Sequence, residues 1–213
     1  MIPQLKLAEL LCTRLCHDLT GPIGAIANGT EFLSEETGKM QEQAIELIGS
    51  SAAQAVARLQ FYRKAYGRIN DDGEVNLESL RKTTADLFTG SKITLDWPDA
   101  HLESSGIPVS YKMGRILLNL VIIASATLLR GGTLSVRLAA DDNSKTVQVR
   151  AEGKSIKWDS EIEQALSQDL SLEALNPKNV QANLTRLLAQ EIDSQLGWHA
   201  TEDTFTISSS RKL

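Results

Sequence analysis

The stretch IPQLKLAELLCTRLCHDLTGPIGAIANGTEFLS, residues 2–34, determines the architecture of the N-terminal third. Its apolar side chains recur at steps of three and four residues, at Leu5, Ala8, Cys12, Leu15, Leu19, Ile23, Ile26 and Leu33. This spacing places them on one face of an α-helix. The stretch therefore predicts one long amphipathic helix.

A second helical stripe follows the polar turn SEETGK at residues 34–39. Its members are Ala44, Leu47, Ile48, Ser51, Ala52, Ala55, Leu59, Tyr62 and Tyr66. The two helices would form an antiparallel hairpin. Two helices bury only the seam between them, and both stripes are wider than a seam. We therefore expect two copies of the chain to pair into a dimeric four-helix bundle with His17 on its outside.

The rest of the chain has a different pattern. The polar segment INDDGE, residues 69–74, predicts a boundary between a helical domain over residues 1–68 and an α/β domain over residues 75–213, each with its own core. In the second domain we expect helices at 77–88, 110–129, 159–167 and 177–196, and strands at 92–97, 133–140, 146–152, 198–200 and 204–208. Helices on one face of a mixed sheet make a two-layer sandwich, so the fold class is α+β.

Composition excludes several function classes. With 213 residues, 42% of them hydrophobic, the chain can fill ordinary cores. Its net charge of −5 and the absence of a basic run argue against a nucleic-acid surface. No stretch predicts a signal peptide or a membrane span, so we expect a cytoplasmic protein. Cys12 and Cys16 cannot complete a metal set, and we interpret them as buried packing residues.

The candidate site is the face of the first helix around His17. Residues at spacings of three, four and seven share that face, and they are small or polar: Thr13, Arg14, Thr20, Gly21 and Gly24, with Asn28 one step further. Glycine inside a helix costs about 1 kcal/mol relative to alanine. We interpret Gly21, Gly24 and Gly29, together with Pro22, as opening the face to a partner protein. We expect the six neighbours of His17 to contact that partner.

The chemistry of His17 suits phosphoryl transfer. A neutral imidazole can attack phosphorus through one ring nitrogen while the other nitrogen is held as a donor. Asp18 would accept that second hydrogen bond, which makes His17 and Asp18 the candidate catalytic residues. The product would be a phosphoramidate, a linkage reactive enough to pass the group to a carboxylate.

The segment HDLTGPIGAIANGTEFL, residues 17–33, resembles the phosphoacceptor box of the dimerising two-helix domains of histidine kinases. In that box an acidic residue, a leucine and, at the fifth place, a proline follow the histidine. The segment is more similar to the ChpT-type histidine phosphotransferases of alphaproteobacteria, which share the pattern HDL-GP-GAI-NG-E-L. The resemblance spans the chain, since these proteins carry a degenerate kinase-like ATPase domain after the hairpin. It implies that His17 carries a phosphoryl group between receiver-domain aspartates of a hybrid histidine kinase and of response regulators.

Compared with an active kinase, the second domain departs at three boxes. Asn119 matches the first asparagine of the kinase N box, but Ile123 stands at the place of the second. Residues 151–155 lack the aspartate and the second glycine of the adenine box, and residues 179–188 lack the glycines of the lid. We therefore expect no ATP, no other cofactor and no metal. Gly21 replaces the Thr or Asn of bifunctional kinases, which argues against phosphatase activity.

Two other functions stay open at this point. An active histidine kinase with a divergent ATP site would show nucleotide-dependent autophosphorylation. A non-catalytic dimeric adaptor for receiver domains would not need His17.

Overall fold

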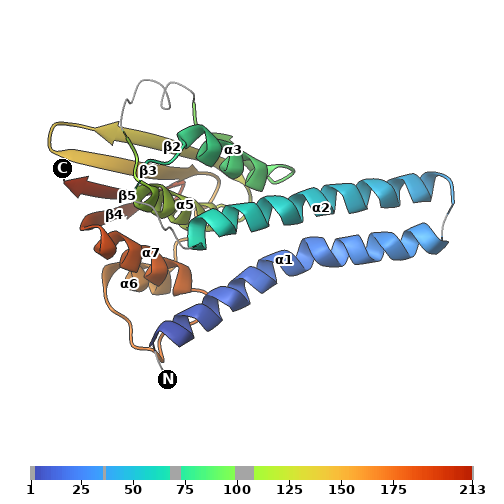
Figure 1. Cartoon of the computed structure of the whole chain (residues 1–213), viewed down its shortest axis with the longest axis horizontal. Coiled ribbons are helices and arrows are strands. Elements are labelled where there is room, and N and C mark those ends of the chain that lie inside the picture. The colour runs from blue at the N-terminus through green and yellow to red at the C-terminus, as the bar shows by residue number, and fades with distance from the viewer. Residues whose placement is uncertain (1–2, 36, 68–72, 99–107, 213) are drawn as a thin grey trace.

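Two long helices, α1 (Pro3–Glu35) and α2 (Lys39–Tyr66), form an antiparallel hairpin that projects from an α/β body (Figure 1). The computed structural model describes residues 3–35, 37–67, 73–98 and 108–212. At a rise of 1.5 Å per residue, α1 is about 50 Å long. The predicted hairpin is confirmed. The proposed domain limits stay a prediction, since most of the boundary segment lies outside the described residues.

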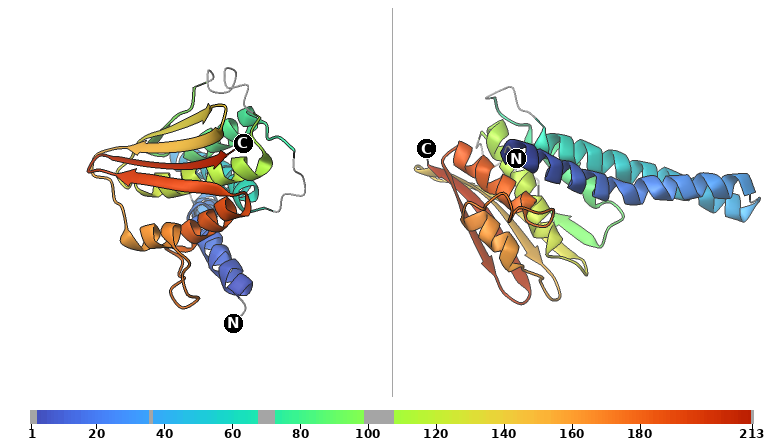
Figure 2. Two further views of the ribbon diagram at one scale, coloured as in Figure 1. Left: turned by 90° about the vertical axis from the view of Figure 1, so that its left-hand side faces the viewer. Right: turned by 90° about the horizontal axis from the view of Figure 1, so that it is seen from below.

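The body contains one five-stranded sheet in the order β1-β2-β3-β5-β4. β1 (Ile93–Asp96) is parallel to β2 (Gly132–Ala140), while β3 (Ser144–Glu152), β4 (Ser194–Ala200) and β5 (Thr204–Lys212) complete it by antiparallel pairing. Its helices are α3 (Leu77–Phe88), α5 (Tyr111–Ala126), α6 (Ser160–Ser167) and α7 (Val180–Glu191). They lie on one face of the sheet, the face from which the hairpin projects (Figure 2), and α3, α5 and α7 contact α1 or α2. The two-layer α+β prediction is therefore confirmed.

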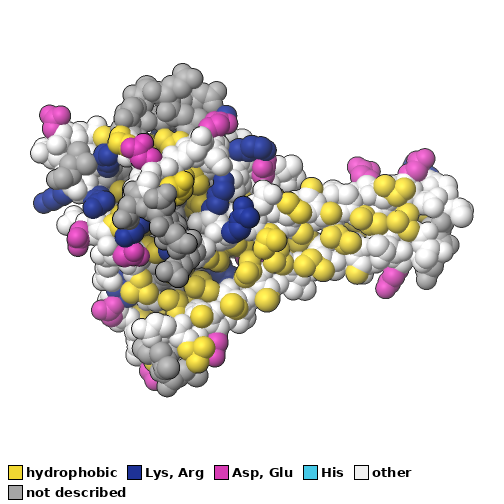
Figure 3. Space-filling model, in the orientation of Figure 1, with side chains coloured by type: hydrophobic (Ala, Val, Ile, Leu, Met, Phe, Trp, Pro, Cys, Tyr) yellow, Lys and Arg dark blue, Asp and Glu magenta, His cyan; other side chains and the backbone are white. Residues whose placement is uncertain are grey.

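Away from the α/β body, each hairpin helix is covered only along its seam with the other helix. Hydrophobic side chains run along the hairpin in the surface view (Figure 3). Six large ones are each more than half exposed: Leu5, Ile23, Met40, Ile45, Val56 and Leu59. No helix among the described residues is both long and apolar enough to cross a bilayer.

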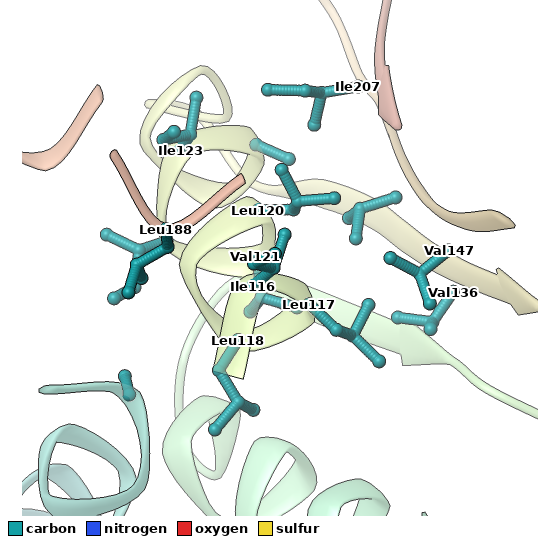
Figure 4. Close-up of a cluster of buried hydrophobic side chains, with 14 of the residues drawn as sticks. Ile116, Leu117, Leu118, Leu120, Val121, Ile123, Val136, Val147, Leu188 and Ile207 are labelled. Atoms are coloured by element: carbon teal, nitrogen blue, oxygen red, sulfur yellow. The ribbon is translucent and has the colours of Figure 1, made fainter. Parts of the chain in front are cut away.

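The main core lies between α5 and the sheet (Figure 4). α5 is apolar on nearly every side because the sheet, α7 and the hairpin surround it, and Ile116, Leu117 and Leu120 are fully buried. In β2, Leu134 and Val136 point inward at the two-residue period of a strand with one covered face.

The same core continues into the base of the hairpin. Phe61 and Ala65 of α2 are fully buried in one cluster with the residues of α5. Two α5 side chains also bond the last carbonyls of α2: Arg115 donates to Ala65 and Tyr66, and Asn119 donates to Ala65. These carbonyls lack partners within their own helix. The expectation of two separate cores is therefore wrong, because α2 needs α5 to cover and cap its last turns.

The last predicted helix was too long. α7 ends at Glu191, Asp193 takes a positive φ of 53°, and β4 begins at Ser194. Leu188, Ile192 and Leu196 follow one another at a helical spacing of four residues, so the apolar pattern alone does not mark the end of the helix. From Ser194 onward, however, burial alternates with the two-residue period of a strand.

Candidate functional site

His17 lies near the middle of α1 with its side chain 86% exposed. Its Nδ1 is 3.2 Å from Oδ1 of Asp18, the next residue. Among the described residues, no group hydrogen-bonds to the other ring nitrogen, Nε2. When Nδ1 carries the proton and donates it to Asp18, the lone pair of Nε2 is available to solvent or to a partner.

Asp18 is held from α2 at two different atoms. The hydroxyl of Tyr62 donates to Oδ2 of its carboxylate, and Nη1 of Arg58 donates to its main-chain oxygen. Arg58 and Tyr62 are one turn apart on α2, so they share a face of that helix. One carboxylate thus joins His17 to the second helix.

Pro22 explains why Arg58 bonds to a main-chain oxygen. In an α-helix the carbonyl of residue 18 accepts from the N–H of residue 22. Pro22 has no N–H, so the carbonyl of Asp18 loses its helical donor. The guanidinium of Arg58 replaces it. Arg58 of α2 thus supplies the hydrogen bond that Pro22 removes from α1, at the residue next to His17.

The ring of Tyr62 is fixed by its neighbours. It stacks on Tyr66 with centroids 5.1 Å apart and packs edge-on against Phe61 at 6.1 Å. Burial, and secondarily the hydrogen bond to Asp18, raise the pKa of Tyr62 well above its usual value. Burial also raises the pKa of Tyr66. Both phenols therefore remain protonated donors at physiological pH.

The residues predicted around His17 share its face of α1. Thr13 and Thr20 bond to carbonyls of their own helix at 2.8 Å and stay exposed, as does Asn28. A methyl group added at Gly21 or Gly24 would meet nothing within 4 Å, so this part of the face is open. Arg14 is partly buried, and its Nε has no partner within the described part of the chain.

Gly29 has a different role from the one predicted. A Cβ at this position would lie 2.6 Å from Cγ1 of Ile48 in α2. Gly29 therefore permits close packing between the two helices and does not open the surface to a partner.

The interpretation of the cysteines was also wrong. Cys12 and Cys16 are both exposed free thiols. Both lie on parts of α1 that are open to solvent, because a single partner helix covers only a narrow seam.

The residues at the three kinase-like boxes are packed or hydrogen-bonded within the fold. Asn119 is fully buried, donates to the carbonyls of Ala65 and Arg115 at 3.0 and 2.7 Å, and accepts from Gln181 at 2.5 Å. Ala151 is buried within β3, and the lid segment forms most of α7. Within the described ranges, no three His, Cys, Asp or Glu side chains are grouped so that they could hold a metal ion.

Sequence reasoning missed Arg58 and Tyr62 as site residues. Pro22 four positions after Asp18 indicated an unpaired carbonyl, but nothing in the sequence identified its donor.

A sequence model described as the histidine phosphotransferase C-terminal domain matches residues 77–204. The chain belongs to the histidine phosphotransferase family. Protein phosphotransferase ChpT of Brucella abortus (strain 2308) is 32% identical to it over 208 residues, which cover 97% of this chain and 96% of that protein. A solved structure described as a bacterial phosphotransferase matches with a TM-score of 0.80 and 31% identity, covering 96% of each chain. The family predicted from residues 17–33, and its activity of histidine phosphotransfer in a phosphorelay, are thereby confirmed.

Proposed function

We propose that His17 is the residue that carries the phosphoryl group, taking it from a receiver-domain aspartate of a hybrid histidine kinase and passing it to receiver aspartates of response regulators. The observation that carries this proposal is the pair formed by an 86% exposed imidazole and a carboxylate at its Nδ1. An exposed nucleophile on a helix can reach an aspartyl phosphate in the shallow site of another protein.

In the transfer step, the Nε2 lone pair attacks the phosphorus of the aspartyl phosphate. An N–P bond forms while the P–O bond to the aspartate breaks, and the carboxylate leaves with the electron pair. The Nδ1 proton stays on the ring, where the negative charge of Asp18 stabilises the positive charge that the ring gains. In the second step, a carboxylate oxygen of the acceptor attacks phosphorus, and the N–P electron pair returns to Nε2.

The face around His17 would receive the receiver domain. Gly21 and Gly24 leave room for close approach, and Thr13, Thr20 and Asn28 offer polar groups at its edge. Arg14, one turn before His17, places a positive charge near the phosphoryl group or an acidic side chain of the partner.

The test uses a purified receiver domain that carries labelled aspartyl phosphate. Wild-type protein should acquire an acid-labile, base-stable label, and His17→Ala should fold and acquire none. His199→Ala is a matched control, because this histidine is also exposed but lies on β4. Labelling of the His17→Ala variant would overturn the proposal. Asp18→Asn should slow the transfer without abolishing it, because an orienting group contributes less than the nucleophile.

We also propose that the chain is a homodimer through the exposed apolar face of its hairpin. Leu5 and Ile23 on α1, and Ile45, Val56 and Leu59 on α2, are 51–58% exposed, although each large apolar side chain gains about 1.5–3 kcal/mol when fully buried. A second hairpin would cover them and complete a four-helix bundle. Ile23 lies about 120° around α1 from His17, so this pairing leaves His17 accessible.

Light scattering tests the dimer. The wild-type protein should have twice the 23.3 kDa mass of the chain. Ile23→Asp and Val56→Asp should lower that mass, whereas Leu129→Asp, at a 67% exposed residue outside the hairpin, should not. If the wild-type protein is monomeric at micromolar concentration, the dimer proposal is wrong, and the proposed transfer chemistry is unaffected.

We place the protein in the cytoplasm, where its exposed thiols Cys12 and Cys16 would stay reduced. Cell fractionation that recovers the protein in a membrane or periplasmic fraction would contradict this location.

A further inference from the structure

We propose that Arg58 and Tyr62 are positioning residues that set the orientation and the tautomer of His17 by holding Asp18. This inference rests on the proposed role of His17 and assigns a function to two residues of the other helix. Within the described structure neither residue is hydrogen-bonded to the imidazole, and both bond to Asp18.

The two contacts fix different degrees of freedom of Asp18. Arg58 bonds to its main-chain oxygen and holds the backbone of α1 at the turn where Pro22 removes a hydrogen bond. Tyr62 bonds to Oδ2 and so limits rotation of the carboxylate. With Oδ2 engaged, Oδ1 remains at Nδ1 of His17, 3.2 Å away. A carboxylate without Tyr62 would be free to turn toward water, because its side chain is 26% exposed.

Tyr62 is itself held in place by the α/β body. Its ring stacks on Tyr66, and the hydroxyl of Tyr66 donates to Oε1 of Gln181 at 2.5 Å. Gln181 in turn donates to the buried Asn119. The position of the Asp18 carboxylate is therefore set by packing and hydrogen bonds that extend from α2 to α7 and α5.

The chemical consequence concerns the ring nitrogens of His17. A carboxylate held at Nδ1 stabilises the tautomer with the proton on Nδ1, which leaves Nε2 as the nucleophile. Nε2 is the nitrogen without a bonding partner among the described residues. Without the two contacts, the imidazole would lose this preference and more of it would carry its proton on the nitrogen that must attack.

The test combines nitrogen-15 NMR of His17 with single-turnover transfer from a phosphorylated receiver domain. In wild-type protein above pH 8, the spectrum should show an excess of the Nδ1–H tautomer. Tyr62→Phe should shift it toward the Nε2–H tautomer that free imidazoles favour, and should slow transfer roughly three- to tenfold, the equivalent of one net hydrogen bond. Arg58→Met should act in the same direction, and Arg58→Lys, which keeps a donor, should restore much of the rate.

Tyr66→Phe is the matched control. It removes the hydroxyl of the neighbouring stacked ring, which bonds to Gln181, and it leaves the hydrogen bond from Tyr62 to Asp18 in place. It should leave the tautomer of His17 closer to wild type than Tyr62→Phe does. In an Asp18→Asn background, Tyr62→Phe should slow transfer much less, since the group through which it acts has changed.

The possible outcomes separate the two proposals. Labelling of His17→Ala would overturn the assignment of His17 itself. If His17→Ala is inactive while Tyr62→Phe and Arg58→Met keep the wild-type tautomer and rate, the positioning role fails alone. If Tyr62→Phe does not fold, Arg58→Met decides the question, because it leaves the buried phenol in place.

Discussion

Replacing Arg58 with methionine measures how far α2 compensates for Pro22. Arg58→Met keeps most of the apolar stem of the side chain but removes the donor to the main-chain oxygen of Asp18. A carbonyl left without a partner costs about 1–3 kcal/mol, and this one is only partly buried, so we expect a loss of about 1.5 kcal/mol. In a chain of this size, that loss lowers Tm by roughly 3–6 °C.

The decisive comparison is the same substitution in a Pro22→Ala background. There the N–H of residue 22 is restored and can donate to Asp18 within α1, so Arg58→Met should cost less than about 0.5 kcal/mol. The expected coupling free energy is therefore about 1 kcal/mol, above the error of additivity for independent sites. Urea unfolding at one fixed protein concentration measures it. Equal costs of Arg58→Met in both backgrounds would refute the view that Arg58 replaces the hydrogen bond that Pro22 removes.

Three further results are expected. Gly24→Ala should stabilise the protein by about 1 kcal/mol in urea unfolding, since the added methyl group meets nothing within 4 Å, yet raise KM for the phosphorylated receiver; an unchanged KM would exclude Gly24 from the docking face. ATP with magnesium should leave Tm unchanged, because the side chain of Asn119 is already committed to Ala65, Arg115 and Gln181; a saturable rise in Tm would revive the kinase hypothesis. Burial raises the pKa of Tyr62 and Tyr66, so above pH about 10 the unfolded chain loses protons that the folded chain keeps, and the free energy of unfolding should fall as pH rises. Tyr62→Phe should make that fall shallower, and an identical pH profile in the variant would contradict the assignment.

Local sequence signals were sufficient for most of the fold. The helix predicted at residues 77–88 matches α3 from end to end, because Asn76 caps it by accepting from the N–H of Ser79. The strands predicted at residues 92–97 and 204–208 are present as β1 and β5, although β5 continues to Lys212. These signals are short in range, and a single sequence contains them in full.

Contacts between distant residues were not predictable in this way. Arg58 and Tyr62 lie 40 and 44 positions from Asp18, and their meeting depends on the register between α1 and α2. Gly21, Gly24 and Gly29 of α1 cannot be told apart from the sequence, yet of these three only Gly29 faces Ile48. The histidine and its acidic neighbour could be found from a motif, whereas the residues that hold them could be found only from the packed hairpin.

The exposure of Cys12 and Cys16 has a practical consequence. They are the only cysteines of the sequence, so a thiol-reactive dye needs no engineered attachment point. Cys16 directly precedes His17, and a polarity-sensitive dye placed there in a Cys12→Ser variant would change its emission when a receiver domain covers the face. Stopped-flow fluorescence would then time the arrival of the partner separately from the appearance of label on His17, and so show which of the two limits the rate of the relay.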